Sequence, residues 1–360
     1  MVGAVAVKAE VRLKGAAPAA SYALVPGVIV DPVRGRAYLM NPRHGIDAIE
    51  ISSGKKIWST AAASKPLAVF NDQIVAQMEG GAPRSMAIAL LDVNSPAKPI
   101  LTAQVPLPTG VTALIDEAIG LRFSATARVT QDGILVTWQS NRQTVSGIAR
   151  PGPPEVSRNS GAALIDPQTG AVRTLAEIPH DESGTVAKTI QRLAAAGVER
   201  PWRVGDFILA VAVRKDRTII RRWDAANGKP IAEIELEPGF GLGVNSADGR
   251  QIAANKPDGA DAHGVRRYDW EIYSLKAGTR AASVMIPTSA APFFTWHTLL
   301  VYVSQPLGYR TNGGWVQAPL AIRAVEIKTG AEVWKRPLRD TRYRGPFVPA
   351  HPPQAPTRIP

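Results

Sequence analysis

The chain contains 360 residues, carries a formal net charge of +12 and has no cysteine. The lack of cysteine excludes disulfides, thiolate metal sites and cysteine nucleophiles. No apolar run approaches the ~20 residues that a membrane-spanning helix needs, and residues 1–20 lack the apolar core of a signal peptide.

The N-terminal segment, residues 4–14, alternates between apolar and charged side chains. The apolar set is Val5, Val7, Ala9, Val11 and Leu13, and the charged set is Lys8, Glu10, Arg12 and Lys14. This period of two predicts one amphipathic strand. Because open sheet edges promote aggregation, we expect this strand to close a ring by pairing with strands from the C-terminal part of the chain.

A short phrase occurs near both ends of the chain. Residues 48–58 read AIEISSGKKIW, and residues 324–334 read AVEIKTGAEVW. Both copies place an acid, a glycine and a tryptophan at the same spacing; these residues are Glu50, Gly54 and Trp58, and Glu326, Gly330 and Trp334. An apolar run that ends at an acid and is followed by a glycine predicts a β-hairpin, since the acid caps the turn and glycine accepts a positive φ.

Weaker copies of the phrase lie between these two. Asp166 with Gly170 and Asp224 with Gly228 keep the acid and the glycine. Two degenerate copies keep one residue each, with Asp92 followed by Pro96 and Ser274 followed by Gly278. Strand-like runs precede most copies, so a unit holds four short strands in roughly 40–60 residues, a spacing typical of β-propellers.

The phrase resembles the tryptophan-docking repeat of quinoprotein-type β-propellers, and the resemblance extends over residues 24–337. That family includes pyrroloquinoline-quinone dehydrogenases and non-enzymatic outer-membrane assembly lipoproteins. The resemblance implies that Trp58 and Trp334 each pack over the glycine turn of a neighbouring blade. It also implies a periplasmic or extracellular location, with a cytoplasmic one as the alternative.

We therefore expect an all-β protein with a single β-propeller of four-stranded antiparallel blades over residues 1–344. Seven blades are favoured and six are the alternative. One helix is predicted within residues 180–202, with Ser183 as N-cap, Gly197 as C-cap and an apolar face of Val186, Ile190, Leu193 and Ala194. Residues 345–360 contain six prolines and predict an extended C-terminal arm.

Three long insertions interrupt the repeat, at residues 141–159, 180–202 and 304–318. Loops on a rigid scaffold often carry function, so these are candidate contact regions for a partner, with a tolerated surface insertion as the alternative for each.

Basic residues form clusters that are either ordinary solvated surface or a face for an acidic protein, anionic lipid or other polyanion. Nucleic acid is less favoured, because no RNA-binding motif accompanies them. The candidate interaction residues are Arg214, Arg217, Arg221, Arg222, Arg266, Arg267, Arg310, Trp315, Arg336, Arg339, Arg342 and Arg344.

No catalytic or metal-binding constellation is evident in the sequence. The acids of the repeat belong to turns in different blades, and the five histidines lack the spacing of a zinc site. We predict no cofactor, no metal and no catalytic residue. The preferred hypothesis is a non-catalytic scaffold outside the cytoplasm that binds protein partners, including the case of an accessory subunit of a membrane-associated complex. The alternative is a quinoprotein-like dehydrogenase or a propeller subunit of a redox enzyme.

Overall fold

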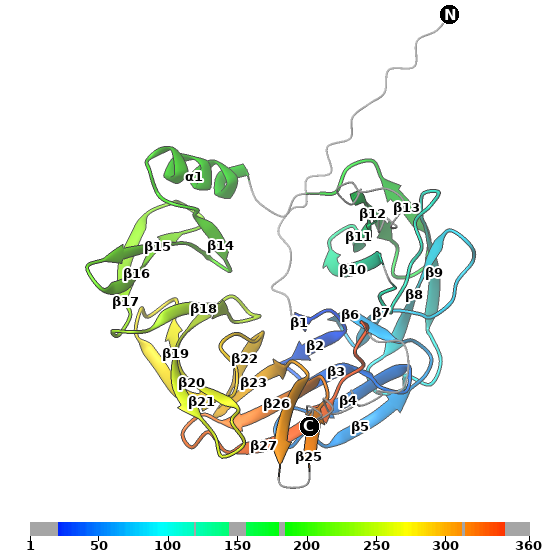
Figure 1. Cartoon of the computed structure of the whole chain (residues 1–360). Helices are drawn as coiled ribbons and strands as arrows, with labels where there is room; N and C mark the ends of the chain where they lie inside the picture. The colour runs from blue at the N-terminus through cyan, green and yellow to red at the C-terminus, as the bar shows by residue number, and fades with distance from the viewer. Residues whose placement is uncertain (1–20, 119, 144–155, 180–183, 312–313, 343–360) are drawn as a thin grey trace, which may run out of the picture.

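The computed structural model describes residues 21–118, 120–143, 156–179, 184–311 and 314–342. These residues form antiparallel sheets, mostly four-stranded, arranged around a central axis, with one helix (Figure 1). The predicted all-β propeller with a short inserted helix is thereby confirmed. The predicted closing strand at residues 4–14 and the proline-rich arm at 345–360 lie outside the described residues.

In the described residues, six sheets of four or five strands follow one another. The first sheet contains β1 (Tyr22–Val25), β2 (Val28–Asp31), β3 (Arg36–Asn41), β4 (Gly45–Glu50) and β5 (Lys56–Thr60). The second contains β6 (Lys65–Phe70), β7 (Gln73–Gln77), β8 (Ser85–Asp92) and β9 (Leu101–Pro106). The third contains β10 (Leu121–Thr130), β11 (Gly133–Gln143), β12 (Val156–Ile165) and β13 (Val172–Leu175).

The second half of the chain repeats this plan. The fourth sheet contains β14 (Trp202–Val204), β15 (Phe207–Arg214), β16 (Arg217–Asp224) and β17 (Pro230–Glu235). The fifth contains β18 (Gly241–Asn245), β19 (Gln251–Ala260), β20 (Arg266–Ser274) and β21 (Arg280–Ile286). The sixth contains β22 (Phe293–Trp296), β23 (Leu299–Ser304), β26 (Ala321–Glu326) and β27 (Glu332–Pro337), with the hairpin β24 (Leu307–Thr311) and β25 (Gly314–Ala318) inserted between β23 and β26.

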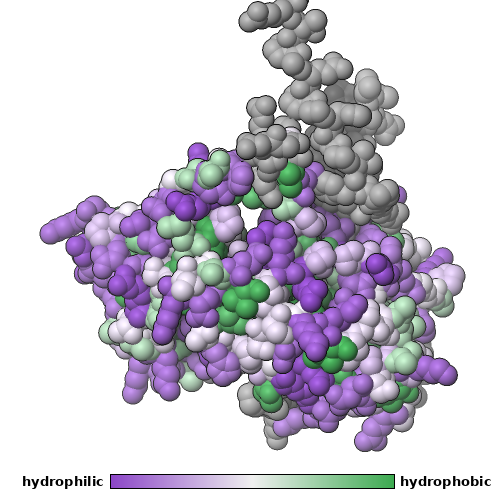
Figure 2. Space-filling view, turned by 90° about the horizontal axis from the view of Figure 1, so that it is seen from below, coloured by the Kyte–Doolittle hydropathy of each residue, from purple (hydrophilic) through white to green (hydrophobic). Residues whose placement is uncertain are grey.

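Five pairs of neighbouring sheets are joined by apolar clusters, which form the core. Clusters join the first sheet to the second, the second to the third, the fourth to the fifth, the fifth to the sixth, and the sixth back to the first. Alternate residues of each strand point to opposite faces, so one strand contributes to two clusters. In β3, Ala37 and Leu39 pack toward the sixth sheet and Tyr38 packs toward the second. The outer surface seen in Figure 2 is mostly hydrophilic, with hydrophobic residues in small separate groups.

The repeated turns connect the last two strands of each sheet, and we call the side of the ring that they occupy the docking side. The indole of Trp334 in the sixth sheet lies over Gly54 of the first, and its Nε1 donates to the Ile51 carbonyl at 2.7 Å. A Cβ at Gly54 would lie 2.5 Å from the indole, so this position accepts only glycine without displacement. Trp58 repeats the hydrogen bond one sheet further on, donating to the Val93 carbonyl at 2.8 Å, at a turn that has Pro96 in place of the glycine.

Other side chains replace tryptophan at the remaining joined interfaces. Arg222 of the fourth sheet lies over Gly278 of the fifth and donates to the Leu275 carbonyl, the position equivalent to Ile51. Leu101 of the second sheet lies over Gly170 of the third. The docking contact is therefore a shared geometry that several residue types can fill.

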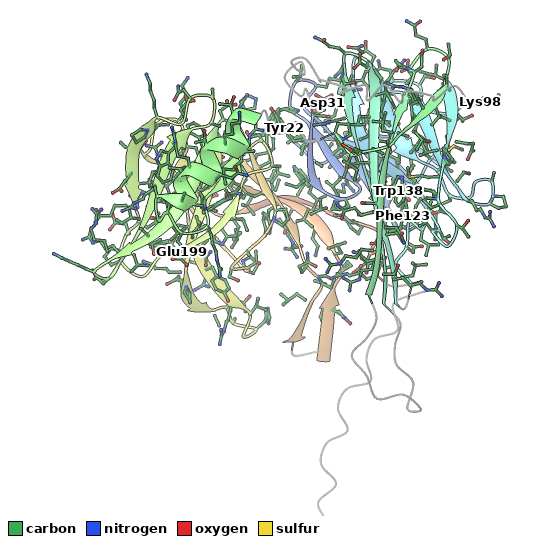
Figure 3. The ribbon with its side chains drawn as sticks, turned by 90° about the horizontal axis from the view of Figure 1, so that it is seen from above. Tyr22, Asp31, Lys98, Phe123, Trp138 and Glu199 are labelled. Atoms are coloured by element: carbon green, nitrogen blue, oxygen red, sulfur yellow. The ribbon has the colours of Figure 1, made fainter. Side chains whose placement is uncertain are left out.

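Between the third and fourth sheets the arrangement differs. No apolar cluster of described residues joins them, and no extensive contact between their strands occurs within the described ranges. Figure 1 shows these two sheets at the two ends of the ring, and Figure 3 looks into the space between them, which we call the opening.

The helix α1 (Gly184–Ala195) covers the face of the fourth sheet that borders the opening. Val186 and Leu193 are buried against Ile208 and Ala225, whereas the predicted apolar residue Ala194 is exposed. Thr189 and Arg192 of the helix contact Gly228, which is the turn glycine of the fourth sheet. At twelve residues α1 is short, and in the described part of the chain no helix has the length and hydropathy to cross a bilayer.

Candidate functional site: a pocket between two hairpins

Long excursions leave the ring on the side opposite the docking turns, which we call the insertion side. They all connect the second strand of a sheet to the third, so the antiparallel order of the strands places them on the same side. The elongated β10–β12 strands and the β24–β25 hairpin project in one direction in Figure 3. Two of these excursions, the β19–β20 hairpin and the β24–β25 hairpin, come together around a pocket.

The loop of the β19–β20 hairpin is held in shape by Asp261. The Asp261 carboxylate accepts hydrogen bonds from the backbone N–H groups of His263 at 2.8 Å and Val265 at 3.0 Å. These backbone bonds hold the pKa of Asp261 below its usual value. Gly264 adopts a φ of 75°, which glycine reaches without strain. The loop is therefore ordered by its own hydrogen bonds before any partner arrives.

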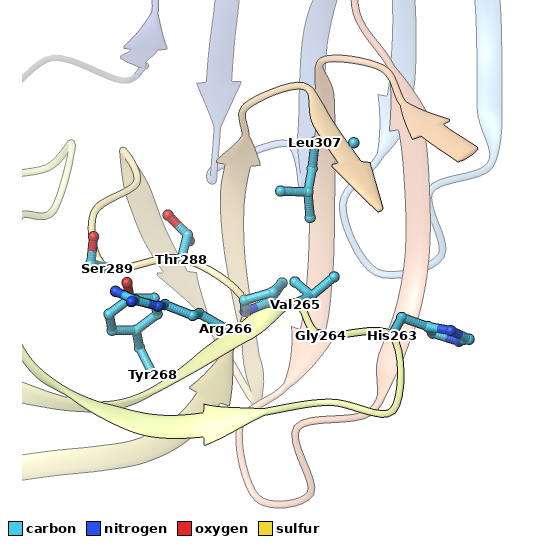
Figure 4. Close-up of a pocket in the computed structure, with 10 residues that line it drawn as sticks. His263, Gly264, Val265, Arg266, Tyr268, Thr288, Ser289 and Leu307 are labelled. Carbon is cyan, nitrogen blue, oxygen red and sulfur yellow. The ribbon is translucent and has the colours of Figure 1, made fainter. Parts of the chain in front are cut away.

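The pocket has a volume of about 500 Å³ and lies between the two hairpins and the connection from the fifth sheet to the sixth. Its lining residues are His263, Gly264, Val265, Arg266, Tyr268, Pro287, Thr288, Ser289, Leu307 and Gly308. Figure 4 shows Arg266, Tyr268 and Ser289 grouped at one end, Leu307 above Val265 and the His263 ring turned outward.

Hydrogen bonds fix the floor of the pocket to the core. The buried Trp270 donates from Nε1 to the Thr288 carbonyl at 2.7 Å, and Asn255 donates from its side-chain amide to the Ser289 carbonyl at 2.7 Å. The Thr288 hydroxyl donates to the Ala290 carbonyl at 2.9 Å. Because these bonds hold the backbone of residues 288–290, the hydroxyl groups of the floor keep their positions relative to β20.

The electrostatic character of the pocket is positive. Arg266 is exposed, and no carboxylate of the described chain lies within ion-pair distance of its guanidinium or of its neighbour Arg267. Neither Asp nor Glu is among the lining residues. A guanidinium beside hydroxyl groups and an apolar Leu307 wall suits a carboxylate or another anionic group attached to a partly apolar body.

The predicted arginines of the fourth sheet lie in a ladder of ion pairs. Arg214 and Arg221 contact Glu233 at 3.5 Å and 3.2 Å, and Arg217 pairs with Glu235. These side chains lie on the face that borders the opening, and all are exposed except Arg221, which is half-exposed. Their charges are largely compensated by the glutamates, so this segment is not a uniformly basic surface.

Three predicted arginines contribute to the structure of the ring. Arg222 is only 2% exposed, and its Nε donates to the Ala232 carbonyl at 2.8 Å. Arg336 donates from Nε to the Gly54 carbonyl at 2.7 Å. The Arg339 side chain, 8% exposed, pairs with Asp116 and Glu79 from the second sheet and its following connection. Arg222 and Arg339 have too little exposed surface to be contacts for a partner.

The remaining candidates fall at the edge of what the structure describes. Arg342 bonds to Asp340 at 2.8 Å and to Gln305 at 3.3 Å. Arg310 and Trp315 are register partners in the β24–β25 hairpin, which borders the pocket, but their side chains are outside the described residues. Arg344 is outside them altogether.

The aspartates of the repeat bind the backbone of their own turns, whereas Glu50 and Glu326 accept hydrogen bonds from the hydroxyl groups of Ser53 and Thr298. Asp92, Asp166 and Asp224 each accept two backbone hydrogen bonds from the residues two and three positions later. Gly54, Gly170, Gly228, Gly278 and Gly330 all have positive φ values between 65° and 76°. Within the described residues, no group of three or more histidine, aspartate or glutamate side chains is arranged to hold a metal ion.

Sequence reasoning missed the polar floor of the pocket. Tyr268, Thr288 and Ser289 belong to no motif, and they come near Leu307 only because the fifth and sixth sheets are neighbours in the ring. The available signal was the unusual length of the β23–β26 connection, which leaves the sixth sheet on the same side as the β19–β20 hairpin leaves the fifth.

Comparisons with known proteins found no matching protein-family profile and no matching curated protein. Among solved structures, "Dihydro-heme d1 dehydrogenase NirN in complex with DHE" is similar at 13% identity and a TM-score of 0.32, with 89% of this chain and 67% of that chain covered. A "Europium-containing methanol dehydrogenase" is similar at 14% identity and a TM-score of 0.23, with 84% and 67% covered.

Proposed function

We propose that this chain is a non-catalytic propeller scaffold that binds a protein partner on its insertion side, where the pocket beside Arg266 receives an acidic side chain of that partner. The pocket itself is the observation that carries the proposal. Two hairpins from adjacent sheets build it, its floor is hydrogen-bonded to the core, and its guanidinium has no carboxylate partner among the described residues.

The chemistry of Arg266 supports an anionic contact. A guanidinium forms charge-assisted, often bidentate, hydrogen bonds with a carboxylate. Arginine and tyrosine are also enriched at the centres of protein interfaces, where they contribute much of the binding free energy. A stable interface buries about 800 Å² on each partner, so the exposed surfaces of the two hairpins would supply the area that the pocket lacks.

The proposal includes the location of the protein and the complex to which it belongs. A scaffold of this kind suits a position outside the cytoplasm, as an accessory subunit of a membrane-associated complex, with the exposed basic residues contributing to attachment. An anionic partner is attracted over about 8–10 Å at physiological ionic strength. Binding should therefore weaken as salt is raised.

A labelled peptide tests the pocket directly. A fluorescein-labelled peptide of alternating glutamate and leucine is titrated with the full chain, and binding is followed by fluorescence anisotropy at two salt concentrations. We expect Arg266→Ala to weaken binding about tenfold, the loss of roughly 1.4 kcal/mol expected for one charge-assisted contact. The matched control is Arg173→Ala, an exposed arginine on β13, which should leave the affinity unchanged. Equal binding by the Arg266 variant and the wild type would remove the pocket from the proposal.

A further inference from the structure

The second sheet buries two polar side chains next to each other at its insertion-side end. Lys65 of β6 and Gln77 of β7 are register partners, so their side chains lie on the same face of the sheet. Lys65 is 3% exposed and Gln77 is fully buried. Val75, two residues before Gln77, belongs to the apolar cluster that joins the second and third sheets. The pair is therefore on the face that is turned toward the third sheet.

Neither side chain has a partner within the described parts of the chain. The nitrogen and the oxygen of the Gln77 amide both lack a hydrogen-bond partner there. Lys65 forms no hydrogen bond or ion pair in the same ranges, and Glu117 acts on it only through a longer electrostatic interaction. The Glu117 carboxylate instead contacts Arg122 at 3.4 Å. Burying an amide without a partner and an ammonium without a counter-charge are both costly, so a further group would stabilise this pair.

The hydrogen-bonding capacity of the two side chains indicates the chemistry of that group. An ammonium offers three N–H donors and no acceptor, and a primary amide offers two N–H donors and one oxygen. A rotation that joined the Gln77 oxygen to the Lys65 ammonium would still leave most of these donors without an acceptor. A water molecule would accept from them but would not balance the positive charge. An anion does both.

The charge and the packing of the surroundings favour a small monovalent anion. Lys65 supplies one positive charge, and the nearby Glu117 carboxylate opposes a second negative charge on the ligand. Leu107 and Val111, from the connection that follows β9, are buried in the same apolar cluster. Close packing of this kind favours an ion of about the size of a water molecule over a larger oxyanion. We infer that a halide ion, with chloride as the common one, binds between the Lys65 ammonium and the Gln77 side-chain amide.

This site is separate from the pocket beside Arg266, which the fifth and sixth sheets build. Only the folded chain brings Lys65 and Gln77 together, since they belong to different strands. An anion that binds the folded chain alone stabilises it in proportion to its concentration. The site therefore makes the stability of the ring depend on chloride.

Urea denaturation of the full chain tests the site when chloride is exchanged for gluconate at constant ionic strength. Gluconate is too large to enter, so it serves as the reference anion. At a chloride concentration ten times the dissociation constant, the folding equilibrium constant of the wild type should be about tenfold larger than in gluconate. In Lys65→Met it should be the same in both salts. In gluconate Lys65→Met should be the more stable protein, and chloride should reduce this advantage because only the wild type binds it.

Two variants serve as matched controls. Lys98→Met removes an exposed lysine of the same sheet, which Figure 3 labels, and should keep the full chloride dependence. Arg266→Ala should keep it as well, so the outcome does not depend on the pocket. Gln77→Leu retains the ammonium but removes the amide donors, so chloride should bind it more weakly than it binds the wild type.

The line width of the chloride-35 NMR signal gives a readout that does not depend on unfolding. Exchange of chloride with a protein site broadens this signal, and the saturable part of the broadening should disappear in Lys65→Met and persist in Lys98→Met. Equal chloride dependence of the wild type and Lys65→Met in both measurements would overturn the inference. A wild type without any chloride dependence would also overturn it, because water or a rearrangement of the two side chains would then complete the pair.

Discussion

Two junctions of the ring cover the equivalent turn glycine in different ways. One lies between the sixth and first sheets, and the other between the third and fourth. At the first junction Gly54 is covered by the indole of Trp334 from the neighbouring sheet. At the second, Gly228 is covered by Thr189 and Arg192 of α1, a helix that belongs to the connection and not to a neighbouring sheet. The turn motif therefore specifies a surface that must be covered, and the residues that cover it decide whether two sheets are joined.

The largest expected effect is at the junction that tryptophan closes. Trp334→Ala removes a side chain that is 7% exposed and leaves a cavity over Gly54, so we expect a loss of about 3–5 kcal/mol in the free energy of unfolding, measured by urea denaturation. Trp58→Ala is the matched comparison. Because Trp58 is only half-buried, its loss should be smaller. A Trp334 variant as stable as the wild type would show that the ring does not depend on this contact.

A smaller effect is expected where arginine replaces the tryptophan. Arg222→Met keeps most of the side-chain volume but removes the donors to the Leu275 and Ala232 carbonyls, of which the Leu275 carbonyl lies in a buried site. We expect a loss of about 2–3 kcal/mol. Arg221→Met, one residue earlier and half-exposed in a surface ion pair, should cost under about 1 kcal/mol. If the two variants were equally stable, the docking role of Arg222 would be refuted.

The smallest effect concerns a buried charge in the second sheet. Lys65 of β6 is 3% exposed, and its burial lowers the pKa of its ammonium group. The unfolded chain then binds more protons than the folded one between the folded pKa and about 10.4, so stability rises with pH in that interval. Lys65→Met should be more stable than the wild type at pH 7, and this advantage should shrink as the pH approaches 10. If the difference in the free energy of unfolding between the two proteins did not change with pH, the buried charge of Lys65 would not be its cause.

Several features of the fold were predictable because they depend on local chemistry. The acids and glycines of the repeat define their turns through bonds within five residues, as with Asp166 and Gly170. The helix was predictable for the same reason, with Val186 and Leu193 at helical spacing. The pocket was not, since Arg266 stood out in the sequence only as part of a basic pair, without the hydroxyl groups that adjoin it.

The sequence by itself determined the class of the fold, because a repeated turn motif with period-two strands is compatible with little other than a propeller. Only the tertiary structure decided which charges are available. Arg222 and Arg266 are the same residue type in similar strand contexts, yet one is buried over a neighbouring glycine and the other lines an open pocket. The difference arises from the sheet that each arginine faces. Arg222 contacts Leu275, about fifty residues away, and Arg266 lies in a pocket with Leu307, about forty residues away.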